Sequence, residues 1–232
     1  MKNALIRNLI FTLITIYLLM FSSRLFGENL TKEKAPLKDE LETIIDTIIE
    51  TYGQEGFYAE FNQISTLKAM DITDTASGKA WFKKPGKMRW EYVQPDKQYI
   101  ITNGITLWIY RPDDAQVMIG NAQSYFLDGK GASFLSDIKL IKDKFKISHE
   151  KNIDTENFYI LKLIPIEKDL EMSDIHLSIA KKNFEITRII TNNFYGDTSI
   201  IEFKNIDFDK SPDDSFFTFN VPEGADILRI SE

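Results

Sequence analysis

The sequence predicts a mainly β protein with a helical lid, an α+β chain. The expected form is a large, incomplete antiparallel β-barrel of about 11 strands that encloses a hydrophobic cavity covered by short helices. Apolar and polar residues alternate in many short segments that turn residues separate, as in antiparallel sheets. Two segments instead repeat apolar residues at spacings of three and four, which indicates amphipathic helices. With 232 residues, 43% of them hydrophobic, one domain with a sizeable core is expected.

The N-terminal segment has the features of a secretory signal peptide. Lys2 and Arg7 precede an apolar run over Leu9–Phe21. This run is shorter than the ~20 residues of a membrane-spanning helix. Cleavage near Gly27 is expected, and an uncleaved anchor is the alternative. The expected organisation is a signal peptide over residues 1–27, a linker over 28–36 and a single domain over 37–232.

Two regions are predicted to be helical. Leu37–Tyr52 carries an apolar stripe at helical spacing, and Gly53 is a suitable stop. Such a helix either packs on the core or closes a cavity as a lid. Alternation also disappears over Gly120–Asp143, where one or two short helices are expected to cross the sheet. The apolar residues assigned to these lid helices are Leu41, Ile44, Ile45, Ile48, Phe134, Leu135 and Ile138.

Strands are expected on both sides of the second helical region. Met70–Gly78 is polar and predicts a turn region, while Asn103-Gly104 predicts a type I′ hairpin turn, since both central residues of that turn need positive φ. Pro85-Gly86 and Pro95-Asp96 are turns as well. The expected strands are Gly56–Ile64, Ala80–Lys84, Met88–Tyr92, Gln98–Thr102, Thr106–Tyr110, Gln116–Ile119, Lys144–His149, Asn157–Ile164, Asp174–Ala180, Glu185–Asn193 and Thr198–Ile206, with Phe216–Phe219 and a tail through Ile230 closing the chain.

Alternation along these strands predicts which side chains share the inner face. Met88, Trp90 and Tyr92 point one way, and Arg89 and Glu91 point the other. An eight-stranded barrel is filled by its own side chains, so a wider one needs water, a plug or a ligand inside. An apolar lining favours an apolar ligand or a helical plug. The lining residues expected are Phe57, Phe61, Phe82, Met88, Trp90, Tyr92, Ile100, Ile109 and either Leu107 or Trp108.

The run W-F-K-K-P-G-K-M-R-W-E-Y-x-x-P, followed by N-G-x-T-L-W-I-Y-x-P, resembles the LolA family of periplasmic outer-membrane lipoprotein carriers. The likeness continues through Gly196-Asp197-Thr198 and Val221-Pro222-Glu223-Gly224, and covers roughly residues 40–230. It implies a half-open β-barrel whose apolar cavity, under helices, receives the acyl chains of lipoproteins. The nine lining residues would then be lipid-binding residues, although Met88 can equally be core filler.

The resemblance also implies a location and partners. A member of this family is a monomer in the periplasm that carries acylated lipoproteins from an inner-membrane lipoprotein-releasing ABC transporter to an outer-membrane acceptor. Lys84 stands where the family has an arginine that latches the lid; lysine keeps the charge but loses the planar five-donor fork. A solvated lysine at a strand end is the alternative. A sensor or carrier of another envelope lipid on the same scaffold is the alternative function.

Other classes of function lack their residues. The chain has no cysteine, which excludes thiolate metal sites, disulfides and a lipidated N-terminal cysteine. His149 and His176 lie far apart in predicted strands without metal-ligand spacing, and no nucleophile motif is present, so neither a metal, a cofactor nor an enzymatic activity is expected. The net charge of −7 disfavours a nucleic-acid partner.

Overall fold

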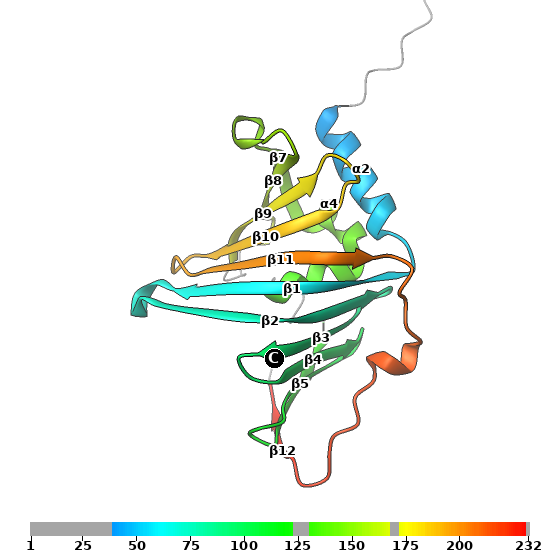
Figure 1. Cartoon of the computed structure of the whole chain (residues 1–232), viewed down its shortest axis with the longest axis vertical. Helices are drawn as coiled ribbons and strands as arrows, with labels where there is room; N and C mark the ends of the chain where they lie inside the picture. The colour runs from blue at the N-terminus through cyan, green and yellow to red at the C-terminus, as the bar shows by residue number, and fades with distance from the viewer. Residues whose placement is uncertain (1–38, 123–129, 168–171, 231–232) are drawn as a thin grey trace, which may run out of the picture. The chain divides into compact units, whose positions relative to one another are not determined.

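The computed structural model describes residues 39–122, 130–167 and 172–230 (Figure 1). The signal peptide and linker predicted over residues 1–36, together with Leu37, lie outside this part. In the described ranges no helix has both the length and the apolar character needed to cross a bilayer.

The described residues form one sheet with a few short helices. The elements are, in chain order, α2 (Glu40–Tyr52), β1 (Gly56–Leu67), η1 (Lys68–Met70), β2 (Ile72–Lys83), β3 (Lys87–Gln94), β4 (Gln98–Asn103), β5 (Thr106–Arg111), β6 (Gln116–Asn121), η2 (Lys130–Leu140), α4 (Ile141–Lys144), β7 (Phe145–His149), η3 (Lys151–Ile153), β8 (Phe158–Pro165), β9 (Met172–Ala180), β10 (Ile186–Asn193), β11 (Thr198–Asp207), η4 (Asp214–Phe217) and β12 (Asp226–Arg229).

The sheet has 12 strands in the order β12-β6-β5-β4-β3-β2-β1-β11-β10-β9-β8-β7. Because β12 and β7 each have a neighbour on one side only, the sheet is open, as the prediction of an incomplete barrel requires. All neighbouring strands are antiparallel except β12, which pairs with β6 in parallel, Asp226 opposite Gln116. The extra strand comes from the C-terminal tail, which the sequence did not identify as a strand.

One further prediction was wrong in detail. The region Met70–Gly78 is largely strand: β2 begins at Ile72 and pairs with β1 over its whole length. Ile72–Thr75 are all exposed, so this part of the strand lacks the two-residue alternation. Near the C-terminus, Phe216 and Phe217 belong to η4, a 3-10 helix.

The predicted β4–β5 hairpin is present, but its turn differs. Gly104 (φ +94°) and Ile105 form the two-residue loop, and Asn103 flanks it without positive φ. A glycine at the first central position is the mark of the type II′ loop rather than type I′. The Asn103 carboxamide oxygen accepts hydrogen bonds from the backbone N–H groups of Ile105 (3.0 Å) and Thr106 (2.9 Å), which explains why asparagine suits this position.

The strand register defines two faces of the sheet. Phe57 pairs with Phe82, Met88 lies opposite Thr102, and Thr102 opposite Leu107, so these residues share one face, which we call the inner face. The buried apolar residues of α2 and η2 belong to the same core cluster as this face. Figure 1 shows α2 in blue beside the β9–β11 end of the sheet, with the green η2 and α4 segment behind the strands. The lid helices, α2 and η2, therefore cover the inner face.

Helix α2 forms where the sequence predicted it. Ile44, Ile45, Ile48 and Tyr52 recur at spacings of one, three and four and are its buried residues. A side chain at Gly53 would place its Cβ 2.0 Å from the Ile49 carbonyl oxygen, so the chain needs a glycine to leave the helix there.

The opposite, outer face is crossed by a C-terminal strap, residues 209–225. Phe216 packs edge to face on Trp81, with ring centroids 5.1 Å apart, and the Arg89 guanidinium lies 4.6 Å from the Phe216 ring. Lys83 donates to the Pro212 carbonyl (2.9 Å) and pairs with Asp214 (3.1 Å). The strap thus brings β12 to the edge of the sheet and leaves the inner face to the lid helices.

Candidate functional site

A cluster of aromatic rings forms the centre of the inner face. Phe57 stacks on Phe82 with ring centroids 4.6 Å apart and planes 13° apart. Trp90 meets Phe82 edge to face at 5.6 Å and Phe61 at 4.7 Å. Offset-stacked and edge-to-face pairs of this kind contribute about 0.5–1.5 kcal/mol each beyond their area burial. The rings come from β1, β2 and β3, so the pairing of these three strands builds the cluster.

The structure brings all nine predicted lining residues to this face. The sequence left either Leu107 or Trp108 of β5 as a lining residue. The strand register shows that Leu107 and Ile109 face inward and that Trp108 faces outward. The fully or largely buried residues are Phe57, Phe61, Phe82, Met88, Trp90, Ile100 and Leu107, while Tyr92 and Ile109 are partly buried against the same cluster.

The predicted lid residues lie against this face as well. Ile44, Ile45 and Ile48 of α2 are buried, as are Leu135 and Ile138 of η2, and Leu41 and Phe134 are partly buried. Trp90 and Met88 are 0% exposed, so neighbouring side chains cover both residues. The lid helices therefore pack in the same core cluster as the aromatic residues of this face.

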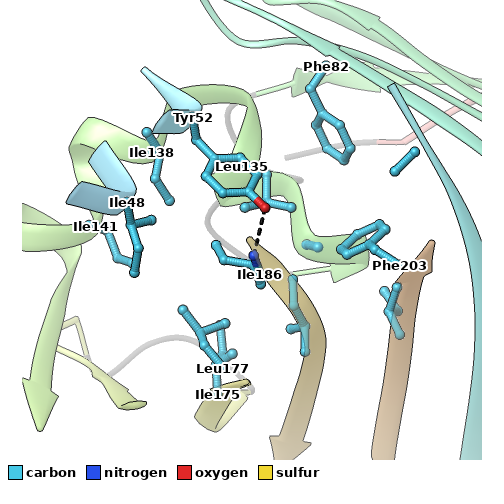
Figure 2. Close-up of a cluster of buried hydrophobic side chains, with 14 of the residues drawn as sticks. Ile48, Tyr52, Phe82, Leu135, Ile138, Ile141, Ile175, Leu177, Ile186 and Phe203 are labelled. Atoms are coloured by element: carbon cyan, nitrogen blue, oxygen red, sulfur yellow. Dashed lines mark hydrogen bonds between the residues drawn. The ribbon is translucent and has the colours of Figure 1, made fainter. Parts of the chain in front are cut away.

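One buried hydrogen bond ties the end of α2 to the sheet. The Ile186 backbone N–H donates to the Tyr52 hydroxyl at 2.7 Å, drawn as a dashed line in Figure 2. The pairing of β10 with β9 is irregular between Ile186 and Arg188, and such a bulge frees a backbone group from the ladder. Tyr52 also packs edge to face on Phe57 (5.0 Å) and Phe208 (5.2 Å). In the sequence, Tyr52 is only the last residue of the apolar stripe, and nothing there predicts this hydrogen bond.

A second link joins η2 to the β2–β3 turn. The Gly86 N–H donates to the Ser136 carbonyl oxygen at 3.3 Å. A Cβ at Gly104 would lie 2.9 Å from the Pro85 carbonyl oxygen, so the two turns pack closely. Lys84 is partly buried in this turn region, and within the described residues its ammonium has no hydrogen bond or ion pair. Gly86, rather than the Lys84 side chain, makes the contact with η2 here.

The other end of α2 is held by charges. Glu40 pairs with Lys151 at 2.6 Å and lies 3.9 Å from His149 Nδ1. His149 Nε2 is 2.8 Å from the Asp154 carboxylate, and the His149 side chain is 4% exposed. The hydrogen bond from Lys151 lowers the pKa of Glu40, so this carboxylate is charged at neutral pH. His149 is thus a structural residue at the edge of the face.

The phenol groups of the site are neutral. Burial raises the pKa of Tyr52 and of Tyr92 far above the ordinary value of 10. The Tyr92 hydroxyl donates to the Gln63 carboxamide oxygen at 2.9 Å. Across residues 39–122, 130–167 and 172–230, no group of three or more acidic or histidine residues could hold a metal ion. An uncharged, aromatic face under apolar helices can bind hydrocarbon, and its described residues offer no arranged acid, base or nucleophile.

Two surface hollows have mostly polar linings, although Phe61 of the inner face borders the smaller one and Phe208 borders the larger one. One, of about 610 Å³, follows the irregular β1–β11 pairing and is lined by Tyr58, Glu60 and Asn205–Lys210. The other, of about 350 Å³, has a polar lining that includes Asn62, Lys79 and Lys204. Their exposed charged linings make them poor sites for an acyl chain.

Known proteins share the sequence pattern of this chain. The family model "Outer membrane lipoprotein carrier protein LolA" matches residues 53–220. Outer-membrane lipoprotein carrier proteins of Chromobacterium violaceum and Coxiella burnetii are 33% identical over 177 residues and 31% identical over 175 residues. These matches cover 76% and 75% of this chain and 82% and 80% of the relatives.

Among solved structures, a LolA superfamily protein from Nitrosomonas europaea matches with a TM-score of 0.48 and 16% identity, over 77% of this chain and 97% of the other. The family assignment rests on the sequence matches. By the extent of the family match and by its relatives, this chain belongs to the LolA family of outer membrane lipoprotein carrier proteins.

Proposed function

We propose that this protein carries lipoproteins by binding their acyl chains on the inner face. The observation that carries the proposal is the apolar plug: the helices that cover the aromatic cluster on an open sheet are themselves apolar on the covered side. Hydrocarbon can replace such side chains without exposing the sheet to water. The lipid-binding residues proposed are Phe57, Phe61, Phe82, Met88, Trp90, Tyr92, Ile100, Leu107 and Ile109.

The size of the hydrophobic effect explains why a carrier is needed. Each buried CH₂ contributes about 0.8 kcal/mol, so one long acyl chain costs roughly 10 kcal/mol to hold in water. A lipoprotein therefore leaves a membrane only if another apolar surface receives its chains. The lid helices must move off the inner face for this to happen, and they are tied to the sheet at few points.

The lid residues proposed to move are those of α2 and η2, with a latch at the β2–β3 turn. Lys84 lies in this turn beside the Gly86–Ser136 contact. Lys84 is the proposed latch. Its ammonium has no partner in the described residues, so it can reach a lid carbonyl or a cargo group when the lid has moved.

The remaining parts of the proposal follow from the family. The chain would be exported by a signal peptide over residues 1–27 and would act in the periplasm as a monomeric domain over 37–232. Cargo would come from an inner-membrane lipoprotein-releasing ABC transporter and pass to an outer-membrane acceptor. The protein would need no cofactor and catalyse no reaction.

Two experiments test this function. Mass spectrometry of the protein purified from its own cells should detect bound lipoprotein or its acylated N-terminal peptide, and depletion should leave lipoproteins in the inner membrane. A protein that co-purifies without lipid, and whose depletion leaves lipoprotein sorting unchanged, would contradict the proposal. Correct sorting after depletion together with bound lipid would favour the sensor or another lipid carrier instead.

A further inference from the structure

Trp90 carries a polar group that the inner face leaves unpaired. Its side chain is 0% exposed, and its Nε1 has no hydrogen-bond partner. More than nine in ten buried polar groups have a partner, so an unpaired indole N–H at the centre of a face needs a reason. This N–H belongs to the candidate site and not to a loop or an edge.

Three polar groups of the inner face and its lid are satisfied, whereas the other buried side-chain atoms without a hydrogen-bond partner in the described residues, His149 Nδ1, Arg188 Nε and Ser211 Oγ, belong to other parts of the sheet and the strap. The Tyr52 hydroxyl accepts from Ile186 at 2.7 Å, and the Tyr92 hydroxyl donates to Gln63 at 2.9 Å. The buried Thr102 hydroxyl oxygen accepts from the Gly104 N–H at 3.0 Å. The face is thus able to pair its polar groups, and the Trp90 donor stands apart from them.

The surroundings of Trp90 define what its N–H can bind. The indole is enclosed by the rings of Phe61 (4.7 Å), Phe82 (5.6 Å), Phe203 (6.1 Å) and Tyr92 (6.4 Å between centroids). None of these rings carries a charge, so a carboxylate or phosphate would be desolvated there without a cation. A neutral acceptor attached to hydrocarbon suits the position, and an ester or amide carbonyl has that chemistry.

We infer that Trp90 Nε1–H is a donor for the carbonyl that links an acyl chain to its lipid. The inference rests on the proposed function and adds a polar specificity to it: the face would bind acyl esters and amides better than plain hydrocarbon of the same length. In the closed protein the donor has no acceptor, and the incoming carbonyl supplies one when the lid helices move aside.

The experiment compares ligands with and without a carbonyl. Methyl decanoate, N-methyldecanamide and dodecane compete with the fluorescent probe 1-anilinonaphthalene-8-sulfonate on the wild type, on Trp90→Phe and on Tyr92→Phe. Trp90→Phe keeps an aromatic ring and removes the N–H. Tyr92→Phe is the matched control because it removes a paired hydroxyl from the neighbouring inner-face position of the same strand.

We expect Trp90→Phe to weaken binding of the ester or the amide by about three- to tenfold more than binding of dodecane, the size of one neutral hydrogen bond. The ligand that loses more identifies the linkage. Tyr92→Phe should affect the three ligands alike. Equal losses for carbonyl ligands and dodecane in Trp90→Phe would overturn the inference and leave the carrier function intact. Failure of all three ligands to bind the wild type would overturn both.

Infrared spectroscopy tests the same inference on the wild-type protein alone. With the ester carbonyl labelled with carbon-13, its infrared stretch in the complex should lie lower than in an apolar solvent, as a hydrogen-bonded carbonyl requires. An unshifted band would overturn the inference even if every variant failed to fold.

Discussion

Removal of the Tyr52 hydroxyl should open the lid without disturbing its packing. Tyr52→Phe keeps the ring contacts with Phe57 and Phe208 but removes the hydroxyl oxygen that accepts a hydrogen bond from the Ile186 N–H. When α2 moves off, that N–H becomes free to bind water, so the bond stabilises the closed state alone. The substitution is therefore expected to shift the equilibrium between the closed and the open lid.

The size of this shift follows from the burial of the Ile186 N–H. A buried donor left without an acceptor costs about 1–3 kcal/mol. If the open state is unaffected, its population rises by roughly 5- to 150-fold, because that is the factor to which 1–3 kcal/mol corresponds. Loading that waits for the lid to open should accelerate by the same factor as long as the closed state remains dominant.

Hydrogen exchange and probe association measure the two effects. Amides of α2 should exchange faster in Tyr52→Phe by the expected factor, and 1-anilinonaphthalene-8-sulfonate should associate faster. Amides of β1–β3 should keep their protection, because the sheet is not altered. Tyr92→Phe serves as the control, since its hydroxyl bonds a side chain of the sheet itself.

Two results would refute the reasoning. Unchanged exchange in α2 would mean that the Tyr52 bond does not hold the lid. Faster exchange by one common factor in α2 and in β1–β3 would mean that α2 opens only when the whole domain unfolds, so it is part of the fixed core and not a lid.

Further predictions concern the inner face, the lid and the strap. Phe82→Glu should abolish binding of a hydrophobic probe, because it buries a carboxylate among rings; retained binding would remove Phe82 from the site. Lys84→Leu should trap lipoprotein on the carrier or block its loading, measured as transfer to outer-membrane vesicles, and normal transfer would rule out a latch. A bismaleimide crosslink between cysteines at Glu40 and Lys151 should prevent loading, whereas one between Arg188 and Glu202, two paired sheet residues, should not. Hydrogen bonds from Lys87 and Lys83 lower the pKa of Asp214 below its ordinary value of 3.8, so the stability they add is present above about pH 4 and is lost as the pH falls through the lower, folded pKa. The difference in Tm between wild type and Asp214→Asn should shrink accordingly in acid, and a constant difference would contradict this pairing.

The central strands could be predicted because their two faces have different surroundings. Met88 and Trp90 are buried while Arg89 and Glu91 are not, so burial imposes the two-residue alternation that the sequence carries. The turn between β1 and β2 could not be placed because Ile72–Thr75 are exposed on both faces and have no alternation to read. The same holds for β12, whose four residues are all exposed.

The contacts that hold the lid could not be predicted from the sequence for another reason. Two of the links between the lid and the sheet use a backbone donor, the Ile186 N–H and the Gly86 N–H, and every residue except proline has such a donor. Only the bulge in β10 and the approach of two turns make these donors available. The unpaired Trp90 N–H could not be predicted from the sequence either, because it depends on the absence of a hydrogen-bond acceptor among the residues that surround it in the fold.

A carrier must bind its cargo strongly and still release it, and the lid helices provide a way to do both. The four buried side chains of α2, Ile44, Ile45, Ile48 and Tyr52, each gain about 1.5–3 kcal/mol from burial, which is roughly 6–12 kcal/mol for the helix. One long acyl chain gains roughly 10 kcal/mol from burial on the same face. Exchange of α2 for a single chain is therefore nearly balanced. The hydrogen bonds of Tyr52 and Gly86, and the one proposed for Trp90 with its cargo, are each of about 1 kcal/mol and so are large enough to decide whether lid or chain occupies the face.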